Sequence, residues 1–160
     1  MKKVFLSVLI LVFSLSLVSC SQARTGEGSL AEEFTLSDIN GNSISLSDYK
    51  DKGNILLFFW TTWCPFCRDE LKKLDSQAET LAADGIEVLT INVGESRHKV
   101  TRYFEAHPVS FKALLDTDTE VSNSYGIGGV PTFFLVDKNG KVIYSGNYFP
   151  DDYNKITPQD

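Results

Sequence analysis

Residues 55–67 read Ile-Leu-Leu-Phe-Phe-Trp-Thr-Thr-Trp-Cys-Pro-Phe-Cys, and this stretch decides the fold. Its first six residues, Ile55 to Trp60, form a continuous apolar run, which is typical of a strand covered on both faces of a sheet, with Trp60 in the core. A helix is expected to follow, because one stripe of apolar residues recurs at intervals of three, four and three: Leu71, Leu74, Ala78 and Leu81. Cys64 and Cys67 therefore stand at a strand-to-helix junction.

The spacing of these two cysteines suits redox chemistry. Three residues are nearly one helical turn, so both sulfurs lie on one side of the helix and can close a small disulfide. Cys64 falls at the helix start, where unpaired backbone N–H groups and the helix dipole favour a thiolate. Pro65 suits the first helical position, where its missing N–H would have no partner. We therefore expect Cys64 to be the attacking thiolate and Cys67 the shielded thiol that resolves the mixed disulfide.

Two other interpretations of the pair are weaker. Half of a zinc site would need further ligands, but the chain has no second cysteine pair, and His98 and His107 lie far along the sequence. Both histidines are expected on an exposed helix face. A purely structural disulfide across so short a loop would constrain the unfolded chain little. The pattern favours redox catalysis that requires no metal and no other cofactor.

The composition describes one ordinary folded domain with a short extension. The chain has 160 residues, 42% of them hydrophobic and 12% aromatic, which is enough for a core without disulfide staples. Lys and Arg number 15 against 21 Asp and Glu, for a net charge of −6. Because nucleic-acid binding needs a basic face to neutralise phosphates, this balance argues against a nucleic-acid partner.

Strand and helix patterns alternate along the rest of the chain. Asn40-Gly41 is a strong hairpin signal between the apolar segments on either side of it. The further expected elements are strands at 34–36, 43–46, 86–93, 132–136 and 141–145, and helices from Ser96 to before Pro108 and at 119–125. This order predicts an α/β fold: a mixed central sheet flanked by helices, with an N-terminal β-hairpin extension and a short C-terminal helix.

The first 19 residues are expected to be an export signal. Lys2 and Lys3 precede an apolar stretch, 4–18, that is shorter than the roughly 20 residues of a membrane-spanning helix. Its end, Leu17-Val18-Ser19-Cys20, resembles the bacterial lipoprotein signal, which implies cleavage before Cys20 and a lipid on its sulfur. Ordinary signal cleavage near Ser19 is the alternative.

The mature protein would then sit outside the cytoplasm, on the periplasmic face of a bacterial membrane. Residues 20–29 are small and polar, as expected of a lipidated N-terminus and flexible linker. The folded domain is expected to occupy residues 30–160.

The active-site segment, residues 58–67, resembles that of the thioredoxin superfamily. The remainder is similar to the membrane-anchored TlpA/ResA-like branch, which includes thioredoxins of cytochrome c maturation. The resemblance runs from about Leu30 to Gly146 and is carried by the Asn-Gly hairpin, residues 91–96, residues 115–118 and the Gly-Val-Pro-Thr segment at 129–132. It implies a thioredoxin fold with a cis bond before Pro131, opposite the sulfurs.

The same resemblance implies the function and the substrate contacts. The expected activity is thiol-disulfide oxidoreduction, in the direction of reducing exported proteins with cysteine pairs, such as apocytochromes c. A DsbD/CcdA-like membrane protein would supply the electrons. The residues expected to contact substrate surround the cysteines and the cis bond: Trp63, Pro65, Phe66, Val130 and Pro131.

Glu70 is the third candidate catalytic residue. It lies three residues beyond Cys67, where a carboxylate could exchange a proton with the resolving thiol. The spacing alone favours a different interpretation, a solvated acid beside Asp69 in the first turn of the helix. ResA-like proteins carry an active-site Glu at this offset, and Phe58 stands where cytoplasmic thioredoxins keep a buried Asp. The resemblance therefore favours Glu70 as the proton carrier.

The sequence departs from this family in two places. Many TlpA-like sites place proline second between the cysteines, whereas Pro65 comes first, as in the oxidant DsbA, so a DsbA-like oxidant or isomerase stays open as an alternative. After Ser145 only 15 residues remain, Pro150 and Pro158 among them, so the closing helix must be short or absent. We expect one face of the sheet near the last hairpin to be thinly covered or completed by a partner.

Two related activities on the same fold fit less well. A peroxiredoxin places Pro, Thr and Cys at offsets of −7, −3 and 0; here Thr61 fits, but Leu57 replaces the proline. A Sco-type copper-binding assembly factor spaces its cysteines four apart and adds a positioned His, unlike the three-residue spacing of Cys64 and Cys67.

Overall fold

The computed structural model describes residues 25–157. The predicted signal peptide, the lipid site at Cys20 and the first part of the linker lie outside the described residues. Within the described part, no helix is long and apolar enough to cross a membrane.

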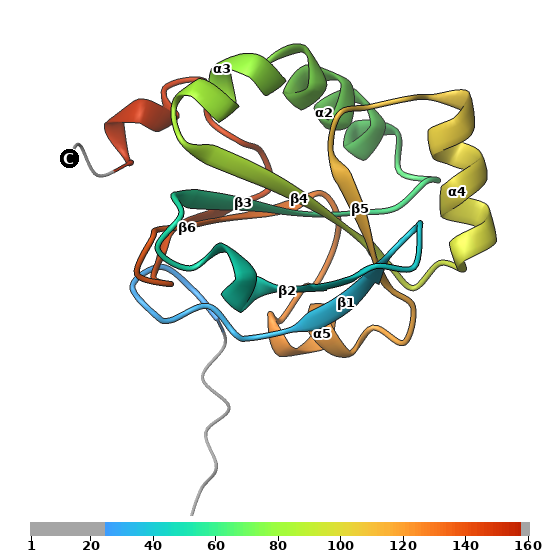
Figure 1. The fold of residues 1–160 in the computed structure, drawn as a ribbon, viewed down its shortest axis with the longest axis horizontal. Coiled ribbons are helices and arrows are strands. Elements are labelled where there is room, and N and C mark those ends of the chain that lie inside the picture. Colours follow the sequence, from blue (N-terminus) through green and yellow to red (C-terminus); the bar gives the residue numbers. More distant parts are fainter. Residues whose placement is uncertain (1–24, 158–160) are drawn as a thin grey trace, which may run out of the picture.

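The chain folds around one seven-stranded mixed sheet (Figure 1). The strand order across the sheet is β2-β1-β5-β4-β3-β6-β7. The central strands β3, β4 and β5 are parallel, and every other pairing is antiparallel. The strands are β1 (Thr35–Asp38), β2 (Ser43–Ser45), β3 (Asn54–Trp60), β4 (Ile86–Val93), β5 (Lys112–Asp116), β6 (Thr132–Val136) and β7 (Val142–Gly146). The predicted mixed sheet and its N-terminal hairpin are confirmed.

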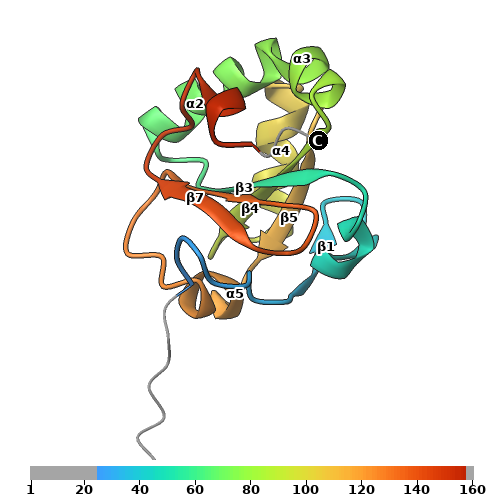
Figure 2. The same ribbon diagram turned by 90° about the vertical axis from the view of Figure 1, so that its left-hand side faces the viewer.

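Helices cover both faces of the sheet. In Figures 1 and 2, α2 (Pro65–Ser76), α3 (Ala78–Ala83) and α4 (Arg97–Ala106) lie on one face, and α5 (Glu120–Ser124) lies on the other. Two short 3₁₀ helices complete the set: η1 (Leu46–Tyr49) and η2 (Tyr153–Lys155).

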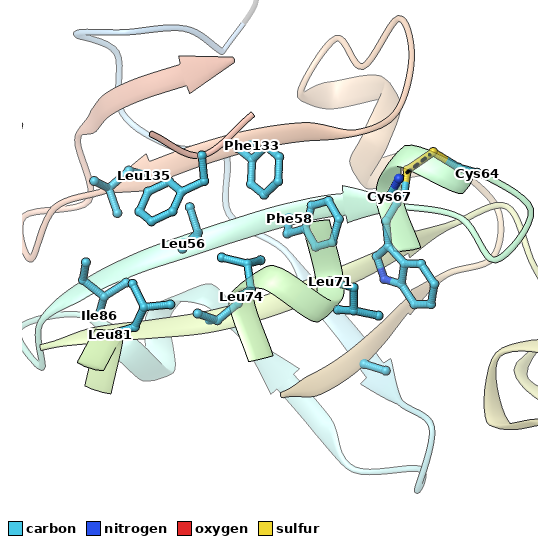
Figure 3. Close-up of a cluster of buried hydrophobic side chains, with 14 of the residues drawn as sticks. Leu56, Phe58, Cys64, Cys67, Leu71, Leu74, Leu81, Ile86, Phe133 and Leu135 are labelled. Atoms are coloured by element: carbon cyan, nitrogen blue, oxygen red, sulfur yellow. Dashed lines mark hydrogen bonds between the residues drawn. A yellow bond between two sulfur atoms is a disulfide. The ribbon is translucent and has the colours of Figure 1, made fainter. Parts of the chain in front are cut away.

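The strand before the cysteines is buried on both sides, as its unbroken apolar run predicts. Leu56, Phe58 and Trp60 point into the core beneath α2, which also holds both cysteines (Figure 3). Their neighbours in sequence, such as Leu57 and Phe59, point into the second core on the face that carries α5. The predicted core position of Trp60 is confirmed, since its side chain is fully buried.

The single helix expected from the apolar stripe at 71–81 is in fact two helices. At Gln77 the backbone leaves helical values, with φ −108° and ψ 5°, so α2 ends and α3 begins. The Ser76 hydroxyl donates a hydrogen bond to the Lys73 carbonyl, a local bond that competes with the helix ladder. Leu81 stays buried across the break, which is why the spacing of apolar residues could not reveal it.

The chain end is short, as predicted, but the sheet beneath it is not thinly covered. After β7 the chain crosses toward α2 and α3 (Figure 2) and ends in the three-residue helix η2. Phe149 and Tyr153 are buried there, and the Tyr153 hydroxyl donates to Asp84 at 2.7 Å. These two aromatic side chains cover the sheet where a closing helix would otherwise lie, so the prediction of a thinly covered face is wrong.

The predicted linker overlaps an ordered segment by five residues. Gly28 N donates to Val142 O at 2.8 Å, and Val142 N donates to Ser29 O at 2.9 Å. The Glu27 carboxylate accepts from Ser145 N at 3.1 Å, and Thr25 is buried. The physical reason is that β7 is a terminal strand of the sheet, whose unpaired backbone groups bind this segment. Residues 25–29 therefore belong with the fold and not with a flexible linker.

Candidate active site

The two cysteines form a disulfide at the start of α2. Cys64 is the N-cap residue and Pro65 the first helical residue, as the sequence predicts. The Cα atoms are 5.2 Å apart, and Cys67 N donates to Cys64 Sγ at 3.1 Å. Both cysteines are buried, Cys67 completely. Figure 3 shows the disulfide at one end of the core that lies beneath α2.

The segment before β6 meets this disulfide. The Val130–Pro131 peptide bond is cis, as expected from the resemblance, and Val130 O lies 3.7 Å from Cys64 Sγ. Because β6 pairs with β3, the end of β3 and the start of β6 lie side by side at one edge of the sheet. Asn147, just after β7, donates through Nδ2 to Pro131 O at 2.9 Å. The sequence did not indicate Asn147.

Exposed aromatic rings surround these residues. Trp63 is 65% exposed and Phe66 76% exposed, although each neighbours a buried cysteine. Tyr148, which follows the residue that bonds Pro131 O, is 63% exposed. Trp63 and Phe66 adjoin the two cysteines in sequence, and Tyr148 adjoins the residue that binds Pro131 O, so the three exposed rings stand on the segments that form this site. Trp63 and Phe66 were expected here, whereas Tyr148 was not.

Glu70 lies on α2, one turn after Cys67, and is half-buried. Its Oε2 atom is shielded from solvent and has no hydrogen-bond partner among the described residues. Burial raises the pKa of Glu70, and the negative charges of Asp151 and Asp69 add to the rise, while Lys73 opposes it. A buried carboxylate without a donor is costly, so these surroundings favour the neutral acid. A neutral carboxylic acid beside a disulfide can give a proton to a departing thiolate.

A second carboxylate, Glu95, fixes the loop that leads to Cys64. Its two oxygens accept from Thr62 N at 2.7 Å, from Thr62 Oγ1 at 2.8 Å and from Asn92 Nδ2 at 2.8 Å. Lys99 Nζ lies 2.6 Å from Oε1. Burial alone would raise the pKa of Glu95, but the hydrogen bonds from Lys99, Thr62 and Asn92 outweigh it and hold the pKa below its usual value.

Sequence reasoning assigned no role to Glu95, although a signal was present. Strands β3 and β4 are parallel, and Trp60 pairs with Asn92 in register. The residues that follow the two strands therefore meet at one edge of the sheet, where α/β proteins bind ligands. By this rule, the position of Glu95 two residues after β4 would have placed it beside the loop that leads to Cys64.

The remaining residues singled out from the sequence are two histidines at the surface and a phenylalanine in the core. His98 and His107 are exposed, as expected, and the His107 ring stacks on Tyr103 at 4.6 Å. Phe58 is fully buried and stacks on Phe133 at 4.5 Å, so the core beneath the disulfide is apolar at that point. Within residues 25–157, no three His, Cys, Asp or Glu side chains gather at metal-binding distances.

Comparison with known proteins agrees with this geometry. Residues 28–145 match the model of the AhpC/TSA family. The thiol-disulfide oxidoreductase ResA of Bacillus subtilis is 39% identical over 126 residues, covering 79% of this chain and 70% of that protein. ResA of Geobacillus thermodenitrificans is likewise 39% identical, over 78% of this chain and 72% of the relative.

Solved structures show the same fold. The thioredoxin domain of a thiol-disulfide oxidoreductase from Bacteroides vulgatus superimposes with a TM-score of 0.72 at 29% identity. That match covers 81% of this chain and 94% of the other. StoA from Bacillus subtilis superimposes with a TM-score of 0.66 at 25% identity, over 79% of this chain and 96% of StoA.

Proposed function

Because this chain belongs to the AhpC/TSA family, and within it is a thiol-disulfide oxidoreductase of the ResA type with a Cys64–Cys67 pair, we propose that it reduces disulfides in exported proteins outside the cytoplasm. The observation that carries this proposal is the placement of the couple. Cys64 caps α2 beside Val130 O, and Cys67 is buried behind it.

The reduction proceeds in two exchanges. The Cys64 thiolate attacks one sulfur of the substrate disulfide, which forms a mixed disulfide and releases the first substrate thiolate to take up a proton. Cys67 then gives up its proton and attacks Cys64, which releases the second substrate thiolate and leaves Cys64–Cys67 oxidised. Two electrons thus pass to the substrate. The N-cap position of Cys64 supports its role as the thiolate, since helix N-termini stabilise anions.

Glu70 is the proton carrier in this scheme. As a carboxylate it accepts the Cys67 proton during the second exchange, and as an acid it returns that proton when a donor reduces the disulfide. The unpartnered, buried Oε2 atom in the oxidised protein supports this role, because it suits the protonated form that the scheme requires at that stage.

The substrate lies across the exposed rings and the cis bond. Trp63, Pro65 and Phe66 contact its side chains, and the backbone of Val130 and Pro131 contacts its main chain beside the attacked disulfide. The exposure of Trp63 and Phe66 supports this arrangement, since the two rings flank the buried cysteines in sequence. Exported proteins with cysteine pairs, apocytochromes c among them, are the proposed substrates.

A lipid on Cys20 anchors the protein to a bacterial membrane. A membrane thiol protein supplies the electrons that reduce the Cys64–Cys67 disulfide again. The support for the anchor is the sequence Leu17-Val18-Ser19-Cys20 after a short apolar stretch. Globomycin, an inhibitor of lipoprotein signal cleavage, tests it: the precursor accumulates if Cys20 is lipidated, and Cys20→Ser abolishes membrane retention. A protein that fractionates unchanged in both cases would refute the anchor.

The experiment that tests the activity is the reduction potential of Cys64–Cys67, measured on the protein with Cys20→Ser by equilibration with thiol buffers and counting of alkylated cysteines. A value near the thioredoxin end, about −270 mV, supports the reductase. A value near about −120 mV would make the protein an oxidant, as the Pro65-first motif allows. Absence of a reversible couple would refute both.

A further inference from the structure

Asn147 joins the end of β7 to the segment that faces the cysteines. Its side-chain amide donates through Nδ2 to Pro131 O at 2.9 Å. The residue before this proline, Val130, has its carbonyl oxygen 3.7 Å from Cys64 Sγ. The hydrogen bond from Asn147 therefore acts on the backbone only one residue away from the group that lies beside the attacking sulfur.

A second side-chain hydrogen bond holds the other side of Val130. Thr132 Oγ1 donates to Gly129 O at 2.7 Å, within the same turn. One bonded carbonyl, that of Gly129, thus precedes Val130 in the sequence, and the other, that of Pro131, follows it. The two bonds together fix the stretch of backbone that is proposed to contact the substrate.

This segment borders open space, so packing alone does not fix its backbone. A hollow of about 480 Å³ is lined by residues that include Gly128, Gly129 and Asn147. Both glycines are exposed, and a Cβ at either would meet no atom within 4 Å. The side chain of Val130 packs against the buried cores, but Gly129 beside it has no such cover. Where few contacts surround a stretch of backbone, its position depends on the hydrogen bonds that remain.

The backbone that carries Asn147 is itself held on both sides. Gly146, just before it, is the last residue of β7 and pairs with β6 in register. Just after it, the Tyr144 hydroxyl donates to Tyr148 O at 2.5 Å, and Phe149 is buried in the core. Figure 2 shows the chain leaving β7 here and turning toward α2. The Asn147 amide therefore has a fixed base, although its side chain is exposed.

We propose that Asn147 is a positioning residue for substrate recognition: its amide holds the Pro131 carbonyl, so that the backbone of Val130 meets the substrate main chain in one fixed position beside Cys64. This inference rests on the proposed function, which lays the substrate main chain along Val130 and Pro131. Asn147 acts through Pro131, and no proton or bond is exchanged at its amide. A backbone that is already fixed loses less freedom when a partner binds, so the hydrogen bond favours substrate binding.

The expected effect depends on whether the substrate has a main chain. A peptide disulfide has peptide groups on both sides of its sulfurs, and these groups can contact Val130. Ellman's reagent is a small aromatic disulfide without peptide groups, so its reaction reports the access and reactivity of Cys64 itself. The ratio of the two rate constants therefore separates a positioning role of Asn147 from a general disturbance of the disulfide.

The test uses the reduced protein with Cys20→Ser, in which Cys64 and Cys67 are the two remaining thiols. Its second-order rate constants are measured with a short peptide closed by one disulfide and with Ellman's reagent, by acid quenching and counting of free thiols. Asn147→Ala removes the amide, and Asn147→Asp keeps its shape but replaces the N–H donor by a carboxylate oxygen that can only accept. Asn139→Ala is the matched control, because this amide lies in the β6–β7 hairpin and bonds Asp137 at 3.4 Å.

We expect Asn147→Ala to lower the ratio of the peptide constant to the Ellman constant by about three- to tenfold, which corresponds to the loss of one hydrogen bond. Asn147→Asp should lower the ratio at least as much, because its carboxylate faces the Pro131 carbonyl without a donor. Asn139→Ala should leave the ratio unchanged.

The outcomes separate the inference from its premise. If the protein with an intact Asn147 does not reduce the peptide, the proposed function is wrong. If it reduces the peptide and both Asn147 variants keep the ratio, the proposed function stands and the role of Asn147 is wrong, because water then replaces the amide. A ratio that falls equally in Asn139→Ala would also overturn the inference, since the stability of the hairpin would then explain the effect.

Discussion

The two carboxylates near the disulfide, Glu70 and Glu95, have opposite surroundings. Glu95 accepts hydrogen bonds from three residues, and its pKa is held down. Glu70 has a buried oxygen that no described residue bonds, and its pKa is raised by burial. Glu70 lies on α2 and Glu95 lies just after β4, and both side chains are at least partly buried. Burial alone therefore does not decide whether an acidic side chain stabilises a loop or exchanges a proton. The number of donors decides it: a satisfied carboxylate anchors a loop, whereas an unsatisfied one is ready to exchange a proton.

The largest expected effect is a loss of stability on removal of Glu95, the carboxylate whose two oxygens both accept hydrogen bonds. Glu95→Ala leaves Thr62 N, Thr62 Oγ1 and Asn92 Nδ2 without their acceptor, so we expect the free energy of unfolding to fall by about 2–4 kcal/mol. Urea unfolding followed by circular dichroism measures it. Glu105→Ala, on the exposed side of α4, is the control and should stay within about 0.5 kcal/mol. Equal losses in the two variants would contradict the anchoring role of Glu95.

Removing the unsatisfied acid should affect the chemistry instead. Glu70→Gln keeps the shape of the side chain but cannot carry a proton, so closure of the Cys64–Cys67 disulfide should slow by about tenfold or more at neutral pH. Stopped-flow release of the second substrate thiolate gives the rate. Glu79→Gln, which removes an exposed acid on α3 that is not among the charges acting on Glu70, should match the unaltered protein. Equal slowing by both variants would mean that surface charge, not proton transfer, sets the rate.

The two acids should also give stability opposite dependences on pH. The raised pKa of Glu70 means that its contribution is fully present below the ordinary value near 4.5 and is lost as pH rises through its folded-state pKa. The lowered pKa of Glu95 means that its contribution is present above 4.5 and is lost as pH falls through its folded-state pKa.

Unfolding of the oxidised protein from pH 3 to pH 8 measures this difference. Glu70→Gln should flatten the profile above about pH 4.5, and Glu95→Gln should flatten it below that value. The comparison between the two acids would be wrong if both variants flattened the same side of the profile.

The smallest effect should come from the ion pair at Glu95. The Lys99 side chain is 54% exposed, so water and salt screen its attraction to the carboxylate. Lys99→Gln should therefore cost no more than about 1 kcal/mol, and 1 M salt should remove most of the difference. Thermal unfolding at low and high salt checks it. A larger loss that salt does not change would show that Lys99 matters by packing, not by charge.

The sequence could predict the parts of this site that depend on near neighbours. The Cys64–Cys67 spacing, the N-cap position and the offset to Glu70 all lie within one helical turn or two, so the period of the helix is enough to place them. The cis bond before Pro131 came from the resemblance, because spacing alone does not select a cis proline.

The parts that were missed depend on long-range packing. Glu95 bonds Thr62, 33 residues away, and Asn147 bonds Pro131, 16 residues away. The helix break at Gln77 leaves the stripe of apolar residues intact, so the spacing of apolar residues in the sequence could not predict it. Phe149 covers the core beneath α2 because the irregular segment after β7 turns back toward that helix. The periodicity of apolar residues predicts helices and strands, and it does not predict the path of an irregular segment.

The N-terminal segment along β7 has a consequence for how copies of the protein meet one another. A bare terminal strand is a template on which another chain can add a strand and begin an aggregate. Here Gly28, Ser29 and Ala31 take hydrogen bonds of the β7 hairpin, and the Glu27 carboxylate takes Ser145 N. The opposite edge, β2, is only three residues long. The molecule can therefore be crowded on a surface without its sheets joining edge to edge.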